Sequence, residues 1–461
     1  MNIKHKLALL LTPLFLIACN DDSNDESNED AINEIAETAS VRIVHASPDA
    51  PTVNVTANGE LLGFLTGVDY QQASESLRID TGASYDIAVE ANTPAGPIEV
   101  LGLELSPDAD VLYNAVAIGS VVDETLELLT LAQTSEELTE GNVRATVVHV
   151  AENAPLVDVY ITAFNDDINA AQANVTLDYK ANSGSIEVPG GEYQIRITPA
   201  GSKTVVFDSG AVELPANNEL LVLATSNVAP GESPVALTIS NGTTSSVVLD
   251  TNTPAALRAV HGVADAPAVD IIANNDIELF DSAEYTNVTD YLNVAPGDYD
   301  VDVAVASDNA TVAIDDANVS LEAGMYYTAV ANNELATIDL DLITDRPRRV
   351  ATAVQVRIFH AASLTSDIDI YLTDDGEITD ATPAFTDIPY LESDLADTGY
   401  AQITAGDYII TVTPSGSKTE VIKTGVLSLQ ANKLYTAFAV NGPNADDAPV
   451  LILADDFVEL D

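Results

Sequence analysis

Four histidines recur along this chain of 461 residues, and a histidine side chain can serve as a metal ligand or as a general base. Successive members of the set are 104, 112 and 99 residues apart. The set consists of His45, His149, His261 and His360. Each stands in a similar phrase, for example "VRIVHASPDAP" and "LRAVHGVADAP". The first question is therefore whether these histidines belong to a catalytic or metal site.

Such a site needs further groups near each histidine, and the sequence offers few. A metal ion requires two or three converging ligands, whereas each repeat supplies one histidine and no cysteine. Asp49 follows His45 by four residues, and Asp265 stands at the same distance after His261. Either pair could act in catalysis, but a loop aspartate also caps turns. Because no Gly-x-Ser-x-Gly elbow or glycine-rich phosphate loop is present, we predict no catalytic residue and no confident metal site.

The residues around each histidine alternate as they do in a β-strand. The positions two and four residues before each histidine are apolar, as Ile43 and Val41 are before His45. The opposite face carries arginines at Arg42, Arg258 and Arg357. We therefore predict that the four histidines are structural: each ends a core-facing row and donates a hydrogen bond to a loop carbonyl.

The whole chain repeats about every hundred residues. Short runs rich in Val, Ile, Thr and Tyr alternate with polar residues and are broken by Gly, Pro, Asn and Asp, which is typical of antiparallel strands. We predict an all-β protein of four tandem immunoglobulin-like β-sandwich domains. The predicted domains cover residues 41–133, 143–250, 256–343 and 354–461. Gly-x-Tyr turns such as Gly191-Glu192-Tyr193 indicate tyrosine corners.

The phrase His-Ala-Ser-Pro-Asp-Ala-Pro, followed by a Val-x-Val strand, resembles the bacterial domain of unknown function 4397. The resemblance is close in the first and third repeats, partial in the second and weak in the fourth. It implies an exported or lipid-anchored protein of β fold and implies no catalytic residue. The second and fourth repeats share "TPAGSKT" and "TPSGSKT", which indicates duplication of a two-domain unit.

The N-terminus predicts export. Residues 1–18 have the basic start and short apolar run of a signal peptide. The run closes on Leu16-Ile17-Ala18-Cys19, which resembles the lipobox of bacterial lipoproteins, so lipid on Cys19 is implied. Residues 19–40 are acid-rich without apolar periodicity and predict a disordered tether. We expect a protein anchored by lipid to the bacterial outer membrane, facing the periplasm or the cell surface.

The charge of the chain limits its partners. The formal net charge of -57 repels phosphate backbones, so nucleic-acid binding is excluded. Two acidic loops offer weak calcium candidates at Asp166, Asp167, Asp374, Asp375 and Asp380. They miss the Asp-x-Asp-x-Asp-Gly pattern, so solvated loops are the favoured interpretation. We predict no cofactor, with structural Ca²⁺ left open.

These features predict a non-enzymatic envelope lipoprotein that acts as an extended binding or spacer module. Its partner would be an envelope protein or a glycan, besides the membrane that holds the lipid. The alternative is an envelope hydrolase or carbohydrate-active enzyme on a β-sandwich scaffold, which would need a converging acid pair or metal site. Short linkers and like charge on every domain predict sandwiches that touch end to end, stiffened by calcium.

Overall fold

The computed structural model describes residues 37–62, 65–134, 136–274, 276–363, 365–391, 395–444 and 446–455. Cys19, the predicted signal peptide and the tether up to residue 36 lie outside the described residues. Within the described part of the chain, no helix is long and apolar enough to cross a membrane. The regular structure there is β-strand apart from one 3-10 turn, η1 (Leu335–Thr337).

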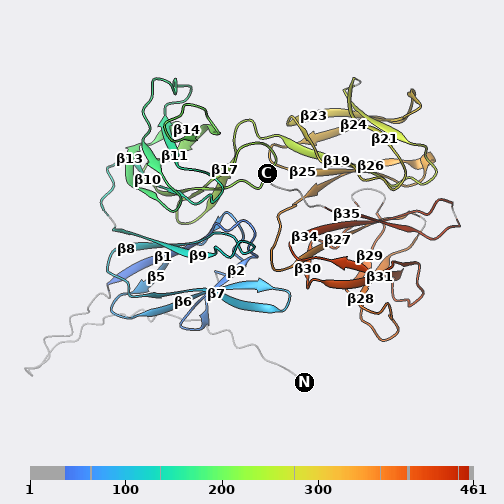
Figure 1. The fold of residues 1–461 in the computed structure, drawn as a ribbon, viewed down its shortest axis with the longest axis horizontal. Helices are drawn as coiled ribbons and strands as arrows, with labels where there is room; N and C mark the ends of the chain where they lie inside the picture. The colour runs from blue at the N-terminus through green and yellow to red at the C-terminus, as the bar shows by residue number, and fades with distance from the viewer. Residues whose placement is uncertain are drawn as a thin grey trace, which may run out of the picture. The chain divides into compact units, whose positions relative to one another are not determined.

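The first repeat contains two sheets, drawn in blue to teal in Figure 1. Its strands are β1 (Thr38–His45), β2 (Val53–Ala57), β3 (Glu60–Leu61), β4 (Gln72–Ala73), β5 (Leu77–Asp80), β6 (Tyr85–Thr93), β7 (Gly96–Leu105), β8 (Val111–Ile118) and β9 (Glu127–Thr134). One sheet has the order β4-β1-β8-β9, with β5 also paired to β1, and the other has the order β3-β2-β6-β7. The two sheets form a β-sandwich.

The second repeat has the same two-sheet design. Its strands are β10 (Asn142–His149), β11 (Val157–Thr162), β12 (Val175–Leu177), β13 (Asn182–Pro189), β14 (Gly191–Pro199), β15 (Phe207–Leu214), β16 (Glu219–Ser226), β17 (Val235–Ser240) and β18 (Ser245–Val248). The sheets have the orders β13-β10-β16-β17-β18 and β12-β11-β14-β15.

The third and fourth repeats follow the same plan. The third has β19 (Ala255–His261), β20 (Val269–Ala273), β21 (Ile277–Ala283), β22 (Leu292–Val294), β23 (Gly297–Val305), β24 (Asp308–Leu321), β25 (Tyr326–Asn332) and β26 (Asp339–Asp345). The fourth has β27 (Val354–Ala361), β28 (Ile368–Thr373), β29 (Phe385–Ile388), β30 (Ala401–Ile403), β31 (Gly406–Pro414), β32 (Ile422–Lys423), β33 (Leu427–Leu429), β34 (Lys433–Val440) and β35 (Val450–Asp455). Their sheets are β22-β19-β25-β26 and β21-β20-β23-β24, then β30-β27-β34-β35 and β29-β28-β31-β32 with β33 on β31.

The histidine-bearing strand of each repeat lies inside a sheet and pairs in parallel with a strand from late in the same repeat. The parallel pairs are β1 with β8, β10 with β16, β19 with β25 and β27 with β34. The expectation of antiparallel strands is wrong for these four pairs. Alternation of apolar and polar residues reports which face is buried and carries no information on strand direction.

The core of each repeat lies between its two sheets. In the first repeat, Ile43 and Ala115 from one sheet pack with Val55 and Ile87 from the other. The predicted tyrosine corners are present as hydrogen bonds: the hydroxyl of Tyr193 donates to the carbonyl oxygen of Pro189 at 2.8 Å. Equivalent bonds run from Tyr299 to Ala295 and from Tyr408 to Thr404. Tandem β-sandwich architecture, predicted from the repeats, is confirmed.

The repeats associate in pairs through their histidine-bearing sheets. Val44 and Val116 of the first repeat lie in one buried cluster with Val148 and Leu223 of the second. An equivalent cluster joins the third and fourth repeats and includes Val260, Val330, Phe359 and Phe438. The expectation of end-to-end contact is wrong for these pairs. The second face of each histidine strand carries an apolar residue beside its polar ones, and burial of these apolar side chains outweighs the repulsion between acidic domains.

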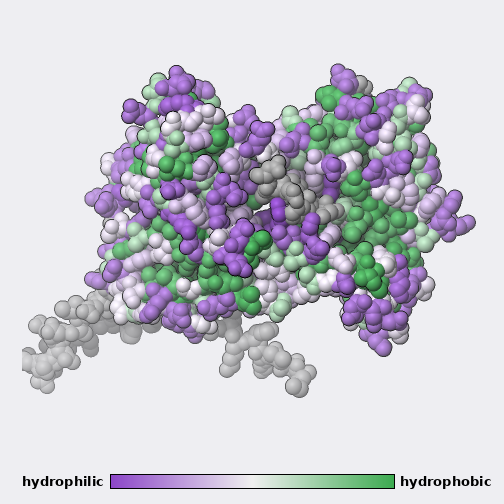
Figure 2. All heavy atoms as spheres, viewed as in Figure 1, coloured by the Kyte–Doolittle hydropathy of each residue, from purple (hydrophilic) through white to green (hydrophobic). Residues whose placement is uncertain are grey.

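The linker between the third and fourth repeats contacts the first repeat. Arg348 donates to the carbonyl oxygens of Pro48 and Ala50, the latter at 2.8 Å, and forms an ion pair with Asp69. Elsewhere, the face drawn in Figure 2 carries hydrophilic residues on every repeat, with hydrophobic patches between them. A surface of this kind fits the acidic composition of the chain.

Candidate binding site between the first and second repeats

The four histidines are buried and face carbonyl oxygens six residues later in the chain. Their Nε2 atoms lie 2.9 Å from Pro51, 3.3 Å from Pro155, 3.1 Å from Pro267 and 3.0 Å from Ser366. In the first repeat, Nδ1 of His45 accepts the backbone N–H of Ser47 at 3.4 Å. Burial lowers the pKa of His45 to about 4, and burial also lowers the pKa of the other three. This placement accords with a structural role, which stays a prediction.

Each histidine ring also contacts a tyrosine that the sequence analysis did not single out. The ring centroids of His45 and Tyr70 are 6.1 Å apart in an edge-on arrangement. The other contacts join His149 to Tyr179, His261 to Tyr285 and His360 to Tyr390. The available signal was a tyrosine that follows each histidine by 24 to 30 residues.

The aspartates that could have completed a histidine and carboxylate pair are engaged elsewhere. Asp49 accepts hydrogen bonds from the backbone N–H groups of Val121 and Val122, both at 2.9 Å. Asp265 accepts from the backbone N–H of Leu335 at 2.8 Å. Both carboxylates therefore hold loops in place.

The calcium candidates do not converge with other ligands in the described part of the chain. Asp167 accepts from the backbone and side chain of Asn169, and the other candidates, Asp166, Asp374, Asp375 and Asp380, lie in exposed loop segments. The acidic group that does converge consists of Asp302, Asp315 and Asp316, whose carboxylate oxygens lie within 4.8 Å of one another. The charge of Asp315 raises the pKa of Asp316. The sequence signal was the pair Asp315-Asp316 within a strand.

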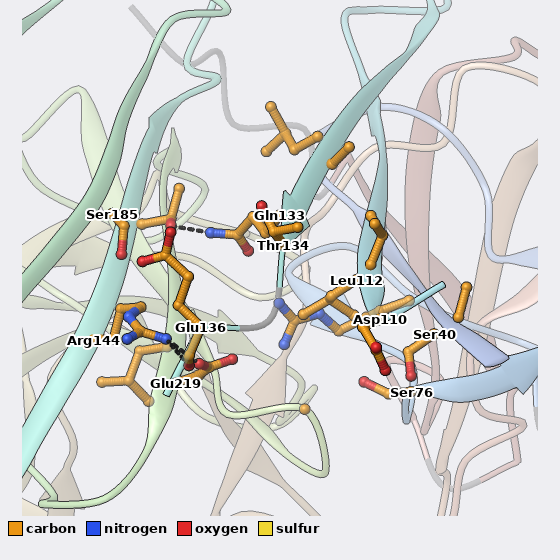
Figure 3. A pocket seen from close by; sticks show the side chains of 18 of the residues that line it. Ser40, Ser76, Asp110, Leu112, Gln133, Thr134, Glu136, Arg144, Ser185 and Glu219 are labelled. Atoms are coloured by element: carbon orange, nitrogen blue, oxygen red, sulfur yellow. Dashed lines mark hydrogen bonds and ion pairs between the residues drawn. The ribbon is translucent and has the colours of Figure 1, made fainter. Parts of the chain in front are cut away.

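A cavity of about 750 Å³ lies between the facing sheets of the first and second repeats. Its walls come from β1, β5, β8 and β9 of the first repeat and β10, β13 and β16 of the second. Figure 3 shows Ser40, Ser76 and Asp110 on the first repeat's wall and Arg144, Ser185 and Glu219 on the other. Sequence analysis missed this cavity because it predicted no face-to-face contact between domains.

Arg42 is the most deeply buried charged residue of this cavity, with 2% of its surface exposed. Its Nε donates to Oδ1 of Asn114 at 2.7 Å, and Nη1 donates to Oγ of Ser240 at 3.1 Å. Within the described residues, no carboxylate oxygen lies within 4.0 Å of its guanidinium. Burial lowers the pKa of Arg42 to about 10. The negative charge of Glu219 acts on Arg42 from beyond ion-pair distance, and the cavity therefore contains an oriented guanidinium with no carboxylate in direct contact.

The other buried arginine of the cavity, Arg144, is neutralised. Its Nη1 lies 2.7 Å from Oε1 of Glu219, and its Nη2 lies 3.4 Å from Oε2 of Glu187. The same guanidinium donates to the carbonyl oxygens of Glu136 and Glu137. Arg144 and Glu219 appear joined in Figure 3. The two buried arginines of the cavity therefore differ in whether a carboxylate balances their charge.

The first and second repeats are called the first pair, and the third and fourth repeats the second pair. The second pair shows which side chains fill the space that corresponds to the cavity. Arg258 corresponds to Arg42, and its Nε donates to Thr328 as that of Arg42 donates to Asn114. Asp345, which is buried, forms an ion pair with Arg357 and lies 4.0 Å from Arg258. Two guanidinium groups therefore share one carboxylate in that interface.

Strand register assigns the equivalent residues in the first pair. Gln133 occupies the position of Asp345, Thr146 that of Arg357, Ser76 that of Tyr291 and Ser185 that of Tyr400. In the second pair, the ring of Tyr291 lies 4.7 Å from the guanidinium carbon of Arg258, and that of Tyr400 lies 4.3 Å from that of Arg357. In the first pair, small residues therefore replace two phenol rings and a guanidinium of the second pair. The cavity occupies the space that these larger side chains fill in the second pair.

Comparison with known proteins concerns the repeats. Residues 39–160 and 255–371 match the family described as domain of unknown function (DUF4397). The chain belongs to the DUF4397 family. The matched ranges start at the first and third repeats, where the resemblance in sequence is closest, and confirm that the DUF4397 domain is repeated. No curated protein matches the chain.

Two solved structures are similar to this DUF4397 protein at low identity. The Bacillus anthracis TIE protein is 13% identical, with 89% of this chain and 69% of that chain covered and a TM-score of 0.15. Two B repeat units of the collagen binding protein of Staphylococcus aureus are 12% identical, with 91% and 99% covered and a TM-score of 0.14. These TM-scores are too low to support an argument about shared structure.

Proposed function

We propose that this protein is a non-enzymatic binding protein of the bacterial cell envelope in which the first two repeats bind a small ligand or the end of a larger one. The observation that carries the proposal is the cavity of about 750 Å³ between them. Its volume is in the range of small-molecule sites, which also occur preferentially between domains. The third and fourth repeats, whose interface is occupied by Tyr291, Tyr400 and Arg357, serve as a spacer.

The lipobox-like sequence at Cys19 supports a lipid anchor at the outer membrane, and the acidic residues after it support a tether. Replacing Cys19 with Ser should abolish incorporation of a labelled fatty acid and release the protein from the membrane fraction. Continued labelling of the Cys19→Ser variant would contradict the anchor without touching the binding function.

The arrangement of the ionisable groups supports binding over hydrolysis. The four histidines face carbonyl oxygens in buried positions, and Glu219, a carboxylate of the cavity, is in an ion pair with Arg144. The hydrolase or carbohydrate-active enzyme is the alternative. Incubation of the full chain with envelope polysaccharides, followed by an assay for new reducing ends, separates the two functions. Formation of new reducing ends would support the enzyme, and their absence would support the binding protein.

The binding function is tested by filling the cavity with the residues of the second pair. In the Ser76→Tyr/Ser185→Tyr variant, both phenol rings are restored. Calorimetry with the purified full chain in detergent measures binding of three ligand sets: neutral oligosaccharides, acidic oligosaccharides and acidic peptides. We expect at least one set to bind the wild type and to lose binding in the double variant. Binding by none of them, or undiminished binding in the variant, would contradict the proposal.

A further inference from the structure

The charge of Arg42 requires compensation that the described part of the chain does not supply within ion-pair distance. A buried charge is stable only when it is paired or richly hydrogen-bonded. Arg258, at the equivalent position of the third repeat, lies by the buried carboxylate of Asp345. The position of Asp345 is occupied in the first repeat by the uncharged Gln133. The first pair therefore has the arginine of this charge cluster and lacks its carboxylate.

The orientation of Arg42 leaves donors for a carboxylate. A guanidinium has five N–H groups, and the bonds to Asn114 and Ser240 use two of them. These bonds hold the planar group in place. Binding of a ligand carboxylate would therefore cost little conformational entropy of the arginine side chain. Arg42 lines the cavity, where no ring takes the place that Tyr291 has in the second pair.

We propose that the cavity binds a sugar acid, with the sugar carboxylate on Arg42 in the role that Asp345 has on Arg258 and the sugar ring in the space that tyrosines fill in the second pair. This inference rests on the binding function proposed above and names its ligand class.

The remaining lining residues favour a hydroxyl-rich ligand. Many are neutral side chains that hydrogen-bond through hydroxyl or amide groups. They are Thr38, Ser40, Ser76, Thr130, Gln133, Thr134, Thr146, Asn182, Ser185 and Asn241. Carboxylates at Asp110, Glu136 and Glu219 also line the cavity and disfavour a doubly charged phosphate more than a singly charged carboxylate. A sugar acid supplies one negative charge together with several hydroxyls.

The test compares matched sugars on matched variants. Calorimetry on the full chain in detergent uses galacturonate and trigalacturonate as acidic probes, with galactose and galactotriose as neutral counterparts. Arg42→Gln removes the guanidinium, and Gln133→Glu supplies an internal carboxylate next to it. Each should weaken binding of the acidic probes by roughly thirtyfold or more, the loss typical of a broken buried charge pair. Lys203→Gln, on an exposed lysine of the second repeat, controls for net charge and should leave binding unchanged.

The outcomes separate the two proposals. Preference of the wild type for the acidic sugars, lost in Arg42→Gln and in Gln133→Glu, supports the inference. Equal binding of acidic and neutral sugars, removed by Ser76→Tyr/Ser185→Tyr, overturns the role of the carboxylate and leaves the binding function standing. Binding of an oligoglutamate peptide in preference to any sugar overturns the assignment of the ligand as a sugar and likewise leaves the binding function standing. Binding of none of these probes overturns both proposals.

Discussion

The hydroxyl of Tyr70 in the first repeat donates a hydrogen bond of 2.6 Å to the carbonyl oxygen of Ser226 in the second repeat. Tyr285 of the third repeat makes the same bond, also 2.6 Å long, to Asn441 of the fourth. Each of these tyrosines contacts a buried, hydrogen-bonded histidine on one side and the neighbouring repeat on the other. The histidine motif is thereby connected to the association of the repeats.

The two pairs differ in the hydrogen bond from the tyrosine of the later repeat to the earlier repeat. Tyr390 donates to the side chain of Asn333, whereas the buried hydroxyl oxygen of Tyr179 has no hydrogen-bond partner among the described residues. Strand register places Gly119 at the position of Asn333. The acceptor is therefore missing because the first repeat has no side chain at this point.

This difference predicts that removing the hydroxyl oxygen of Tyr70 and that of Tyr179 will change the free energy of unfolding by different amounts. Tyr70→Phe should lower the free energy of unfolding by about 1 kcal/mol, because a buried carbonyl loses its donor. Tyr179→Phe should change it by less than about 0.5 kcal/mol or raise it, because no bond is lost. Denaturant unfolding of the full chain measures both. Equal destabilisation by the two changes would contradict the assigned contacts.

The buried histidines predict acid sensitivity. The pKa of His45 is about 4 in the folded protein and near 6.5 when the chain is unfolded. Below pH 6.5 the unfolded state binds a proton at this histidine and the folded state does not. The histidine therefore lowers the free energy of unfolding progressively from pH 6.5 to about 4.

His45→Gln isolates that contribution from the titration of the many carboxylates. The variant should be less stable than the wild type at pH 7 by about 1–3 kcal/mol, because packing and a hydrogen bond are lost. Its stability should fall less steeply between pH 6.5 and 4. Thermal melting at several pH values measures the difference, and parallel curves for the two proteins would show that His45 does not titrate as proposed.

The buried charge cluster of the second pair predicts a large effect at Asp345. Asp345→Asn removes the carboxylate charge that forms an ion pair with the guanidinium of Arg357 and should cost about 3–5 kcal/mol. Gln133→Asn, at the equivalent position of the first pair, changes no charge and should cost much less. Separate unfolding transitions or hydrogen exchange in β19 and β27 can report the loss. Similar costs for both variants would show that charge pairing is not the dominant contribution.

The acidic group on β23 and β24 predicts a stabilising substitution. Repulsion from Asp315 raises the pKa of Asp316, so the ionised carboxylate of Asp316 opposes folding at neutral pH. Asp316→Asn should raise the melting temperature at pH 7, and the gain should disappear as the pH falls below about 3.8, where both states are protonated. Asparagine also tolerates the φ of 53° at this position.

Asp374→Asn, in an exposed loop, is the control for net charge and should have little effect. A lower melting temperature for Asp316→Asn, abolished by a chelator, would contradict the repulsion and would indicate a bound cation in its place.

Much of the architecture follows from local sequence alone. Alternation around His45 and the Gly-x-Tyr turn at Tyr193 are sufficient to predict strands, their core-facing sides and the tyrosine corners, because these depend on residues close together in the chain. Repetition of the same pattern predicts four similar sandwiches, and the position of the histidine within each follows from the two-residue period.

The cavity could not be predicted in this way. Arg42 lies on the face of its strand away from the core, where solvent exposure is the ordinary expectation. It is buried only because Ser240, about two hundred residues later, belongs to a sheet that packs on that face. Likewise, the exchange of Tyr291 for Ser76 acquires meaning only when the two pairs of repeats are compared in space. Tertiary packing decided which outer faces are interfaces, because burial there depends on contacts between distant segments.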